Sequence, residues 1–570
     1  MKLIEKYIGK FGRYQAIIYG LLFLPGAISG CLTLLFTFTG AVPKHRCRLA
    51  TLDNNDSSLF NNPMVFTNWT VETVLGPLEK EGGKQIYCSY CPSHQAFVQD
   101  RSQFLPCNST EAVACDNDRI FDDSQYQTSL AIDFDMVCSG YWKRDLAKSM
   151  FLVGKLVGSV IFGFISDKWG RRPVFLICSL SGIISFNIVP FLPSYWLICL
   201  FQIINGTVTY GTYLTAFVFV MELIGGFYRT ICGVWIQGFF TVGYIYVGVA
   251  AYLIRRWEHL QWAVGLWAVF LVPYYWLIPE SVRWLAVRGR IEEAQKILMK
   301  ASKHNGKPLD ENALRYDLLL LVDDNDKQER KASASATVLD LFKHPLLAVN
   351  TVIVFFTWAA VAMTYYGLAF NADDLPGNDY TNFLLLGIAE VPGLLASIPL
   401  MLYMGRRFAL VSLMGTGGLA CIICACLPRD QTSAIVGLAM FGKMSISGAF
   451  AVIYNYSAEL FPTVVRQSST GLSSLCGRIG SILAPQVHLL GKLYSPWVPM
   501  LVYGVIATIA AATDIFLPET KNQPMPDTIN DSIQFCKSNN VIPCLKKLAE
   551  ASLSSTPHEK PPKDSRETQI

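Results

Sequence analysis

Residues 163–172 read GFISDKWGRR, and the last three residues of this stretch return as Gly405-Arg406-Arg407. Two other motifs return in the same order: Glu222 and Arg229 as Glu459 and Arg466, and Pro279-Glu280-Ser281 as Pro518-Glu519-Thr520. The three offsets are 235, 237 and 239 residues. Because three motifs repeat at nearly one spacing, the chain is predicted to consist of two related halves.

Apolar runs surround these motifs. Hydrophobic residues make up 52% of the 570 residues and charged residues only 16%, which argues against an ordinary soluble chain. The apolar residues come in runs of about 20, the length at which a helix crosses a hydrocarbon core. The first run, 14–38, is too long for a cleavable signal peptide and has no small-residue cleavage site. A polytopic membrane protein is therefore expected.

Twelve membrane-spanning helices are predicted, six in each half. They are expected near residues 14–38, 146–165, 173–191, 195–219, 230–254 and 260–278, and near 348–369, 382–403, 408–427, 434–456, 469–491 and 497–516. The predicted fold class is an all-α membrane protein of two six-helix bundles, 14–278 and 348–516. A central loop with amphipathic helices (279–347) joins them, and a polar tail (517–570) follows.

Basic residues indicate the orientation. They precede the first span, follow the second and recur in the central loop, as Lys6, Arg13, Lys168, Arg288 and Lys296 illustrate. The positive-inside rule then places residues 1–13, the central loop and the tail in the cytoplasm of a multi-pass protein of the plasma membrane. The net charge of +4 is too small and too scattered to indicate a nucleic-acid partner.

The loop 40–141 is expected outside the cell. It contains glycosylation sequons at Asn55, Asn68 and Asn108. It also contains six cysteines: Cys47, Cys88, Cys91, Cys107, Cys115 and Cys138. An even set of cysteines beside sequons predicts a disulfide-linked extracellular loop, with the pairing left open. Alternatively, Cys88 and Cys91 are half of a zinc site, but no second pair with suitable spacing follows, so no metal is expected.

The repeated motifs lie at predicted cytoplasmic helix ends and carry matched charges. Asp167, Arg171 and Arg172 can form ion pairs with Glu222 and Arg229, and the second half repeats the last two as Glu459 and Arg466. Ion pairs that form in one arrangement of the helices and break in another would bias a two-state carrier. Alternatively, the basic residues only satisfy the positive-inside rule, which leaves the acidic partners unexplained.

At these residues the chain resembles a known family. The stretch 163–172 is similar to the loop motif after the second helix of the major facilitator superfamily. Other motifs resemble its organic cation, carnitine and organic anion transporter family, and the carnitine branch in particular: FGRYQ (11–15), PKHRC (43–47), PESVRWL (279–285), YYGL (365–368), ELFPTVVR (459–466) and LPETK (517–521). The resemblance reaches to about residue 529 and implies a transporter, not an enzyme. Leu402 stands where the second loop motif would carry its acid.

Four charged residues lie inside predicted spans: Lys155, Glu390, Lys443 and Arg478. A charge there costs roughly 2.5–3.5 kcal/mol, so such residues usually face a cavity or a partner. The resemblance places Glu390 where cation carriers have an acid, and Arg478 where anion and carnitine carriers have arginine; it gives no support for Lys155. An acid and a guanidinium in one cavity suit a zwitterion such as carnitine or a betaine. Alternatively, Glu390 and Arg478 pair with each other.

Aromatic residues complete the predicted substrate site. Trp358 and Tyr365 are seven residues apart and share a helix face, as Gln237 and Phe240 also do. The resemblance places all four in the cavity wall, where rings attract quaternary ammonium with up to about 2 kcal/mol. Alternatively, the rings only pack helices together.

The remaining motifs concern partners and competing functions. Glu567-Thr568-Gln569-Ile570 fits a terminal ligand of PDZ modules. The phosphate-binding pattern Gly-x-x-x-x-Gly-Lys-[Ser/Thr] does not occur in the sequence, so direct drive by ATP is not expected. No cofactor is expected, and sodium or proton coupling stays open. His488 stands alone in the eleventh predicted span. The expected function is transport of small organic zwitterions or cations by alternating access. The alternatives are an organic anion or simple organic cation transporter of the same family, a sugar porter, and a cell-surface receptor that uses the cysteine-rich loop.

Overall fold

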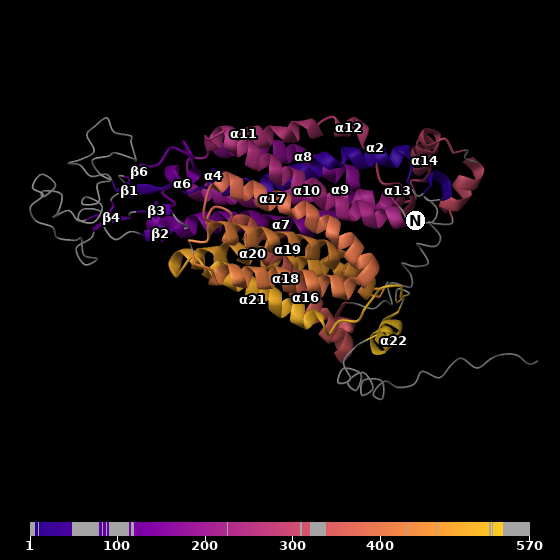
Figure 1. Cartoon of the computed structure of the whole chain (residues 1–570). Coiled ribbons are helices and arrows are strands. Elements are labelled where there is room, and N and C mark those ends of the chain that lie inside the picture. The colour runs from indigo at the N-terminus through magenta and orange to yellow at the C-terminus, as the bar shows by residue number, and fades with distance from the viewer. Residues whose placement is uncertain are drawn as a thin grey trace, which may run out of the picture.

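The computed structural model describes residues 6–9, 11–47, 79–81, 84–86, 88–90, 113–115, 119–224, 226–307, 311–319, 338–428, 430–462, 464–523, 526 and 528–539. Long helices run side by side along one axis, and the short strands lie beyond one end of them, opposite the N-terminus (Figure 1). These two ends are named the strand end and the N-terminal end below.

The first group of helices comes from the first half of the chain. It contains α2 (Arg13–Leu21), α3 (Phe23–Leu34), α4 (Phe36–Thr39), α7 (Tyr141–Trp169), α8 (Arg171–Ile188), α9 (Tyr195–Leu223), α10 (Gly226–Leu253), α11 (Trp257–Gly265), η4 (Leu266–Leu271) and α12 (Tyr274–Leu277). Helices α7 and α8 pack against α9, and α10 packs against α3. Gly206 permits the close approach of α9 to α7, because a Cβ at Gly206 would lie 2.0 Å from the Phe151 carbonyl oxygen.

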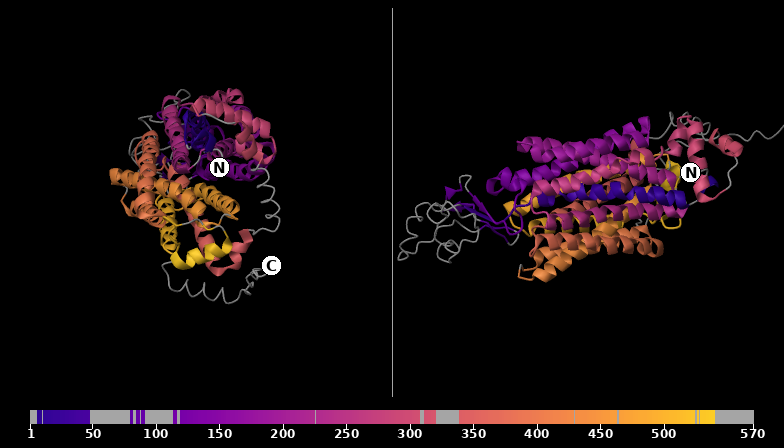
Figure 2. Two further views of the ribbon diagram at one scale, coloured as in Figure 1. Left: turned by 90° about the vertical axis from the view of Figure 1, so that its right-hand side faces the viewer. Right: turned by 90° about the horizontal axis from the view of Figure 1, so that it is seen from above.

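The second group contains α16 (Pro345–Phe370), α17 (Asp379–Pro399), η6 (Leu400–Met404), α18 (Arg406–Cys426), α19 (Thr432–Leu460), α20 (Arg466–Leu493) and α21 (Val498–Asp514). Here α16 packs against α20, α17 against α19, and α18 against α19 and α21. The two groups occupy opposite sides of the molecule (Figure 2). They meet where α7 lies against α20 and where α10 lies against α17.

Shorter helices lie at the N-terminal end. They are α13 (Val282–Val287), α14 (Ile291–Asn305), η5 (Val338–Lys343) and α22 (Ile529–Asn539). Helix α14 buries Ala294, Leu298 and Ala301 on one face and leaves its glutamates and lysines on the other, as the predicted amphipathic pattern requires.

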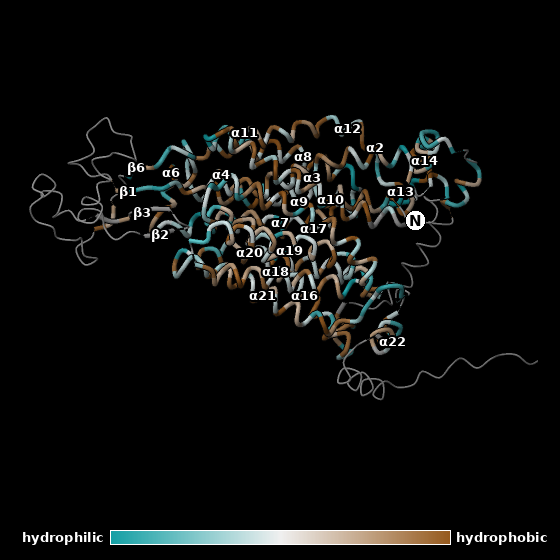
Figure 3. The backbone as a smooth tube through the Cα atoms, viewed as in Figure 1, coloured by the Kyte–Doolittle hydropathy of each residue, from teal (hydrophilic) through white to brown (hydrophobic). Residues whose placement is uncertain are grey.

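Apolar residues dominate the middle of the long helices (Figure 3). Among the described residues, ten helical runs are long and apolar enough to cross a membrane, from Arg13–Thr39 to Thr432–Leu460. Each lies within a few residues of a predicted span. Many large apolar side chains on these helices are exposed, such as Ile184 and Leu200. So large an apolar surface is typical of a protein embedded in lipid.

The second predicted span needs a correction at its start. The prediction begins it at residue 146, but α7 begins at Tyr141 and includes Arg144 and Asp145. A hydropathy pattern treats each charge as if it faced lipid. Here Arg144, Asp145 and Lys148 are buried next to charged residues of other segments, so the helix can continue through them.

The loop 40–141, for which the sequence predicted no secondary structure, contains short strands. β1 (His45–Cys47) pairs parallel with β3 (Lys84–Ile86) and antiparallel with β6 (Arg119–Phe121), and β2 (Glu79–Glu81) pairs antiparallel with β3. A second pair is formed by β4 (Ser89–Tyr90) and β5 (Val113–Ala114). The runs are only two or three residues long and carry little apolar periodicity, so they gave no strand signal in the sequence.

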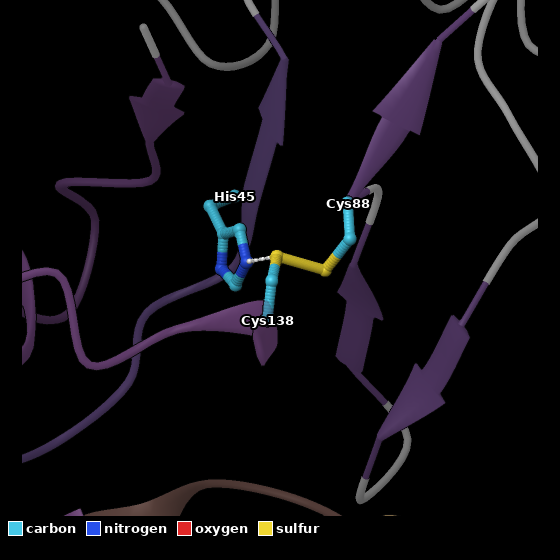
Figure 4. A group of neighbouring side chains, drawn as sticks. All are labelled: His45, Cys88 and Cys138. Carbon is cyan, nitrogen blue, oxygen red and sulfur yellow. Dashed lines mark hydrogen bonds between the residues drawn. A yellow bond between two sulfur atoms is a disulfide. The ribbon is translucent and has the colours of Figure 1, made fainter. Parts of the chain in front are cut away.

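Two disulfides hold this loop together: Cys47–Cys115 and Cys88–Cys138. Because Cys88 is bonded to Cys138, the zinc alternative for Cys88 is wrong. Nε2 of the buried His45 lies 3.5 Å from Sγ of Cys138 (Figure 4). The predicted disulfide residues Cys91 and Cys107 and the sequons at Asn55, Asn68 and Asn108 lie outside the described residues.

Candidate functional site

A cavity lies between the two groups of helices and encloses about 860 Å³, including space open to solvent. All seven residues of the predicted substrate site lie on its wall: Lys155, Gln237, Phe240, Trp358, Tyr365, Glu390 and Arg478. They come from five helices of both groups, namely α7, α10, α16, α17 and α20. The structure therefore brings the predicted residues together, and their role in binding stays a prediction.

Glu390 is already paired inside the wall. Its Oε1 lies 2.9 Å from Nζ of Lys443 on α19, and its Oε2 accepts a hydrogen bond of 2.6 Å from Thr241 on α10. Lys443 also donates to the Tyr365 carbonyl oxygen at 3.0 Å and lies 3.3 Å from the centre of the Tyr365 ring. The alternative in which Glu390 pairs with Arg478 is thus wrong, because Lys443 reaches Glu390 from the neighbouring helix.

In the described part of the chain, Lys155 and Arg478 are the cations that face the cavity. Nζ of Lys155 donates to Thr33 Oγ1 at 2.7 Å and lies 5.7 Å from the ring centres of both Phe240 and Tyr366. The Arg478 guanidinium lies 3.7 Å from the centre of the Tyr210 ring. Among the described residues, no carboxylate lies within ion-pair distance of either cation. Since Lys443 neutralises Glu390, the wall carries a net positive charge.

Aromatic rings form much of the remaining wall. Trp358 donates from Nε1 to Ser457 Oγ at 2.8 Å, and its ring lies edge-on to Tyr454. The sequence reasoning missed five rings of the wall: Tyr210, Tyr213, Tyr366, Phe450 and Tyr454. Tyr210 and Tyr213 are three residues apart on α9, and this spacing inside a span was the signal that could have indicated them.

Some of the ion pairs predicted for the charge latch of the first half are present, and the latch role stays a prediction. Arg171 lies 3.0 Å from Asp167 and 3.0 Å from Glu222. Glu280 accepts hydrogen bonds from the backbone N–H groups of Arg171 and Arg172, at the N-terminus of α8, where the helix dipole favours an anion. Burial raises the pKa of Glu280 above its ordinary value, although the hydrogen bonds from these amides act to lower it.

The second half repeats this arrangement. Arg406 lies 3.0 Å from Glu459, and Glu519 accepts hydrogen bonds from the backbone N–H groups of Arg406 and Arg407 at the start of α18. Gly170 and Gly405 precede the two helices with φ of 104° and 102°, a conformation that only glycine adopts easily. Glu280 and Glu519 were thus missed as capping groups, although both belong to repeated motifs.

The other predicted latch residues have different positions. Arg466 donates from Nε to the Phe461 carbonyl oxygen at 3.1 Å rather than to Glu459. The side chain of Arg229 lies outside the described residues, and so does the terminal motif 567–570.

A second group of charges lies at the strand end and is named the end cluster. It consists of Arg144, Asp145 and Lys148 on α7, Asp373 and Asp374 after α16, and His488 and Lys492 on α20. Arg144 is paired with Asp373, and Lys492 lies 2.6 Å from Asp374. Burial opposes ionisation of Asp374, but the charges of Lys492 and His488 outweigh it and hold the pKa of Asp374 well below its ordinary value.

His488 is not alone, contrary to the prediction from the sequence. Its Nδ1 lies 3.1 Å from Asp145 Oδ1, and its Nε2 lies 2.6 Å from Asp374 Oδ2. These residues are 343 and 114 positions away in the chain, so no local pattern could indicate the contact.

Comparisons with known proteins agree with this geometry. Residues 141–528 match the family described as "Sugar (and other) transporter". Over 93% of this chain and 94% of the relative, 36% of residues are identical to the "Organic cation transporter protein" of Drosophila melanogaster. "Solute carrier family 22 member 6-A" of Xenopus laevis is 30% identical over 93% of each chain. "Solute carrier family 22 member 3" of Mus musculus is 29% identical over 96% of this chain and 98% of the relative.

A solved structure shares the fold. The inward open xylose transporter XylE from E. coli covers 90% of this chain and 98% of its own, with a TM-score of 0.60 and 14% identity. Family match, relatives and fold agree with the resemblance seen in the motifs. The chain belongs to the major facilitator superfamily and, within it, to the family of organic cation and organic anion transporters, which are multi-pass membrane transporters and not enzymes.

Proposed function

We propose that this chain carries small organic anions across the plasma membrane by alternating access, through twelve spans arranged as two six-helix halves. Helices α20 and α21 would supply the eleventh and twelfth spans. In this proposal the strand end lies outside the cell and both termini lie in the cytoplasm. Disulfides form in oxidising compartments, and the strand end carries two of them, whereas the basic loops lie at the opposite end.

The contacts between the two groups of helices support a carrier that is shut on the outside. The polar contacts described between the groups lie from the cavity to the strand end, such as Arg144 with Asp373, Ser149 with Gln486 and Tyr126 with Asp379. The latches of Arg171 and Arg406 stay within their own halves. An inward-facing state of a rocking carrier would have this distribution of contacts.

The charge of the cavity carries the choice of substrate. Lys155 and Arg478 face the space without an acidic partner among the described residues, while Glu390 is neutralised by Lys443. A guanidinium binds a carboxylate through two parallel hydrogen bonds, and the surrounding rings suit an apolar or aromatic body. An organic anion with a carboxylate or sulfonate therefore fits best.

A zwitterion of the carnitine or betaine type is the second candidate. Its carboxylate would use Arg478, and the rings of Tyr210, Tyr213 and Tyr454 would surround its quaternary ammonium group. For Glu390 to contribute, its contact with Lys443 would have to loosen on binding.

Uptake into cells that express the chain tests both candidates. Labelled aryl carboxylate, carnitine, a simple organic cation and a hexose are compared, each with and without sodium. We expect the aryl carboxylate to be taken up fastest, and Arg478→Ala to abolish this uptake while the exposed cytoplasmic control Arg283→Ala leaves it unchanged. Hexose uptake that survives Arg478→Ala would favour a sugar porter. Binding of an external partner without flux of any solute would favour a receptor.

The terminal motif 567–570 is proposed as a ligand for a PDZ scaffold. Loss of scaffold binding on removal of the last four residues, with uptake per surface molecule unchanged, would support this role.

A further inference from the structure

His488 bridges the two groups of helices at the strand end. Asp145, which contacts Nδ1, belongs to α7 of the first group, while His488 itself and Asp374, which contacts Nε2, belong to the second. The ring is buried. Asp145 and His488 are therefore together only while the strand end is closed.

The groups that face His488 come from every segment packed around it. They are Arg144, Asp145 and Lys148 from α7, Asp373 and Asp374 from the segment after α16, Lys492 from α20 and Tyr503 from α21. Tyr503 donates its hydroxyl hydrogen to the Ala484 carbonyl oxygen, so it supplies no proton to the ring. The three basic side chains and the three carboxylates balance one another in charge.

The geometry of the ring requires one additional proton. A neutral imidazole has a single N–H, and an ionised carboxylate can only accept hydrogen bonds. Nδ1 is within hydrogen-bond geometry of Asp145 at 3.1 Å, and Nε2 lies 2.6 Å from Asp374 without forming a hydrogen bond. A neutral ring has a proton on only one of these nitrogens and leaves the other nitrogen unprotonated beside a carboxylate. The two contacts are favourable together only when the ring, or one of the two carboxylates, carries a further proton. The closed strand end therefore favours an additional proton at this site.

We propose that His488 is a proton-binding site, and that the bound proton locks the strand end of the carrier shut. This proposal rests on the proposed function in one respect, the assignment of the strand end to the extracellular side. Opening separates Asp145 from the ring, separates Arg144 from Asp373 and admits water. The proton is then released to the outside, and it must be taken up again when the strand end closes.

The direction of the pH effect follows from this linkage. The closed state keeps the proton at pH values where the opened, hydrated ring has lost it, so external acid favours the closed state and external alkali favours opening. Below about pH 6.5, the ordinary value for histidine, both states hold the proton and the dependence ends. A carboxylate beside a titrating group changes its proton affinity by about tenfold or more. The equilibrium between the closed and open states should therefore change with pH by a similar factor.

A labelling experiment tests the proposal without any substrate. Ser481 is nearly buried on the cavity wall, and Ser481→Cys reacts with a membrane-impermeant maleimide from outside only when the strand end opens. External pH is raised from about 6.5 to about 8.5 at fixed cytosolic pH. The labelling rate of Ser481→Cys is divided by the labelling rate of Ser481→Cys/His488→Gln. In this ratio the pH dependence of the thiol reactivity cancels. We expect the ratio to rise about tenfold. A ratio that does not change with pH would overturn the proposal.

Two further variants keep the test decisive. Asp145→Asn retains the ring and removes the carboxylate that only the closed state supplies, so it should flatten the pH dependence as His488→Gln does. His259→Gln removes an exposed histidine at the strand end, on α11, and should retain the full dependence. If His259→Gln flattened it instead, the site would be elsewhere. Uptake measured in parallel separates the hypotheses: pH-dependent labelling without any solute flux refutes the proposed transport function and leaves the proton site standing.

Discussion

Replacing Lys443 by methionine removes the positive partner of Glu390 and keeps an apolar chain of similar length. The two side chains are 0% and 1% exposed, and Nζ lies 2.9 Å from Oε1. Removal of one member of a buried pair leaves the other charge uncompensated, which typically costs about 3–5 kcal/mol. The remaining hydrogen bond from Thr241 reaches only Oε2 of Glu390. We therefore expect Lys443→Met to lower stability by about 3 kcal/mol or more.

A double-mutant cycle isolates the pair. Glu390→Gln alone leaves Lys443 without its acid, whereas Lys443→Met/Glu390→Gln leaves neither charge buried. The double variant should be more stable than the sum of the single losses predicts, by more than about 1 kcal/mol. The measurement is the unfolding midpoint of purified protein in one detergent, followed by tryptophan fluorescence. Additive losses would refute the idea that Lys443 neutralises Glu390. In transport, Lys443→Met should also increase uptake of cations relative to anions, because it returns a negative charge to the wall.

Three other predictions follow from the packing and the charges. Glu280→Gln and Glu519→Gln should each lower the unfolding midpoint by an equivalent of about 0.3–1 kcal/mol, since each removes an anion from the N-terminus of a helix; unequal effects would count against equivalent roles in the two halves. Gly206→Leu should prevent folded protein from reaching the surface because of its contact with Phe151, while Gly163→Ala, with open space around it, should express normally; surface biotinylation measures both. The charges of Arg144 and Lys492 hold the pKa values of Asp373 and Asp374 below the ordinary value, although burial acts in the opposite direction. The resulting stabilisation of the folded state is present above about pH 4 and is lost as the pH falls through the folded-state pKa values. On acidification, the free energy of unfolding of Asp373→Asn should therefore decrease less than that of the unsubstituted protein.

The membrane-spanning runs could be predicted because the hydrocarbon core imposes both length and composition on each helix. The internal repeat was visible because Gly170 and Gly405 need the same backbone conformation and the same glutamate cap. The seven cavity residues were named from intramembrane charge and from resemblance, and both signals are local to each residue.

Contacts between distant segments could not be predicted from the sequence patterns. Lys443 was recognised as an intramembrane charge, but nothing in the spacing shows that it reaches Glu390 on another helix. The predicted second span left out Arg144 and Asp145, and His488 was expected to stand alone in its span. The structure buries all three residues as members of one cluster drawn from three segments. The strands of the loop 40–141 lie in a segment that contains two disulfides among its described residues, and no spacing determines the pairing of these cysteines.

The disulfide from Cys88 to Cys138 joins the loop 40–141 covalently to the residue that precedes α7 by three positions. Arg144 and Asp145, which close the strand end, follow within two turns of that helix. Under the proposed alternating-access mechanism, a force applied to the loop would be transmitted to α7, which would tilt during the cycle. An antibody fragment that binds the loop and restricts its movement would slow turnover without entering the cavity. Inhibition at this segment would therefore not depend on the substrate.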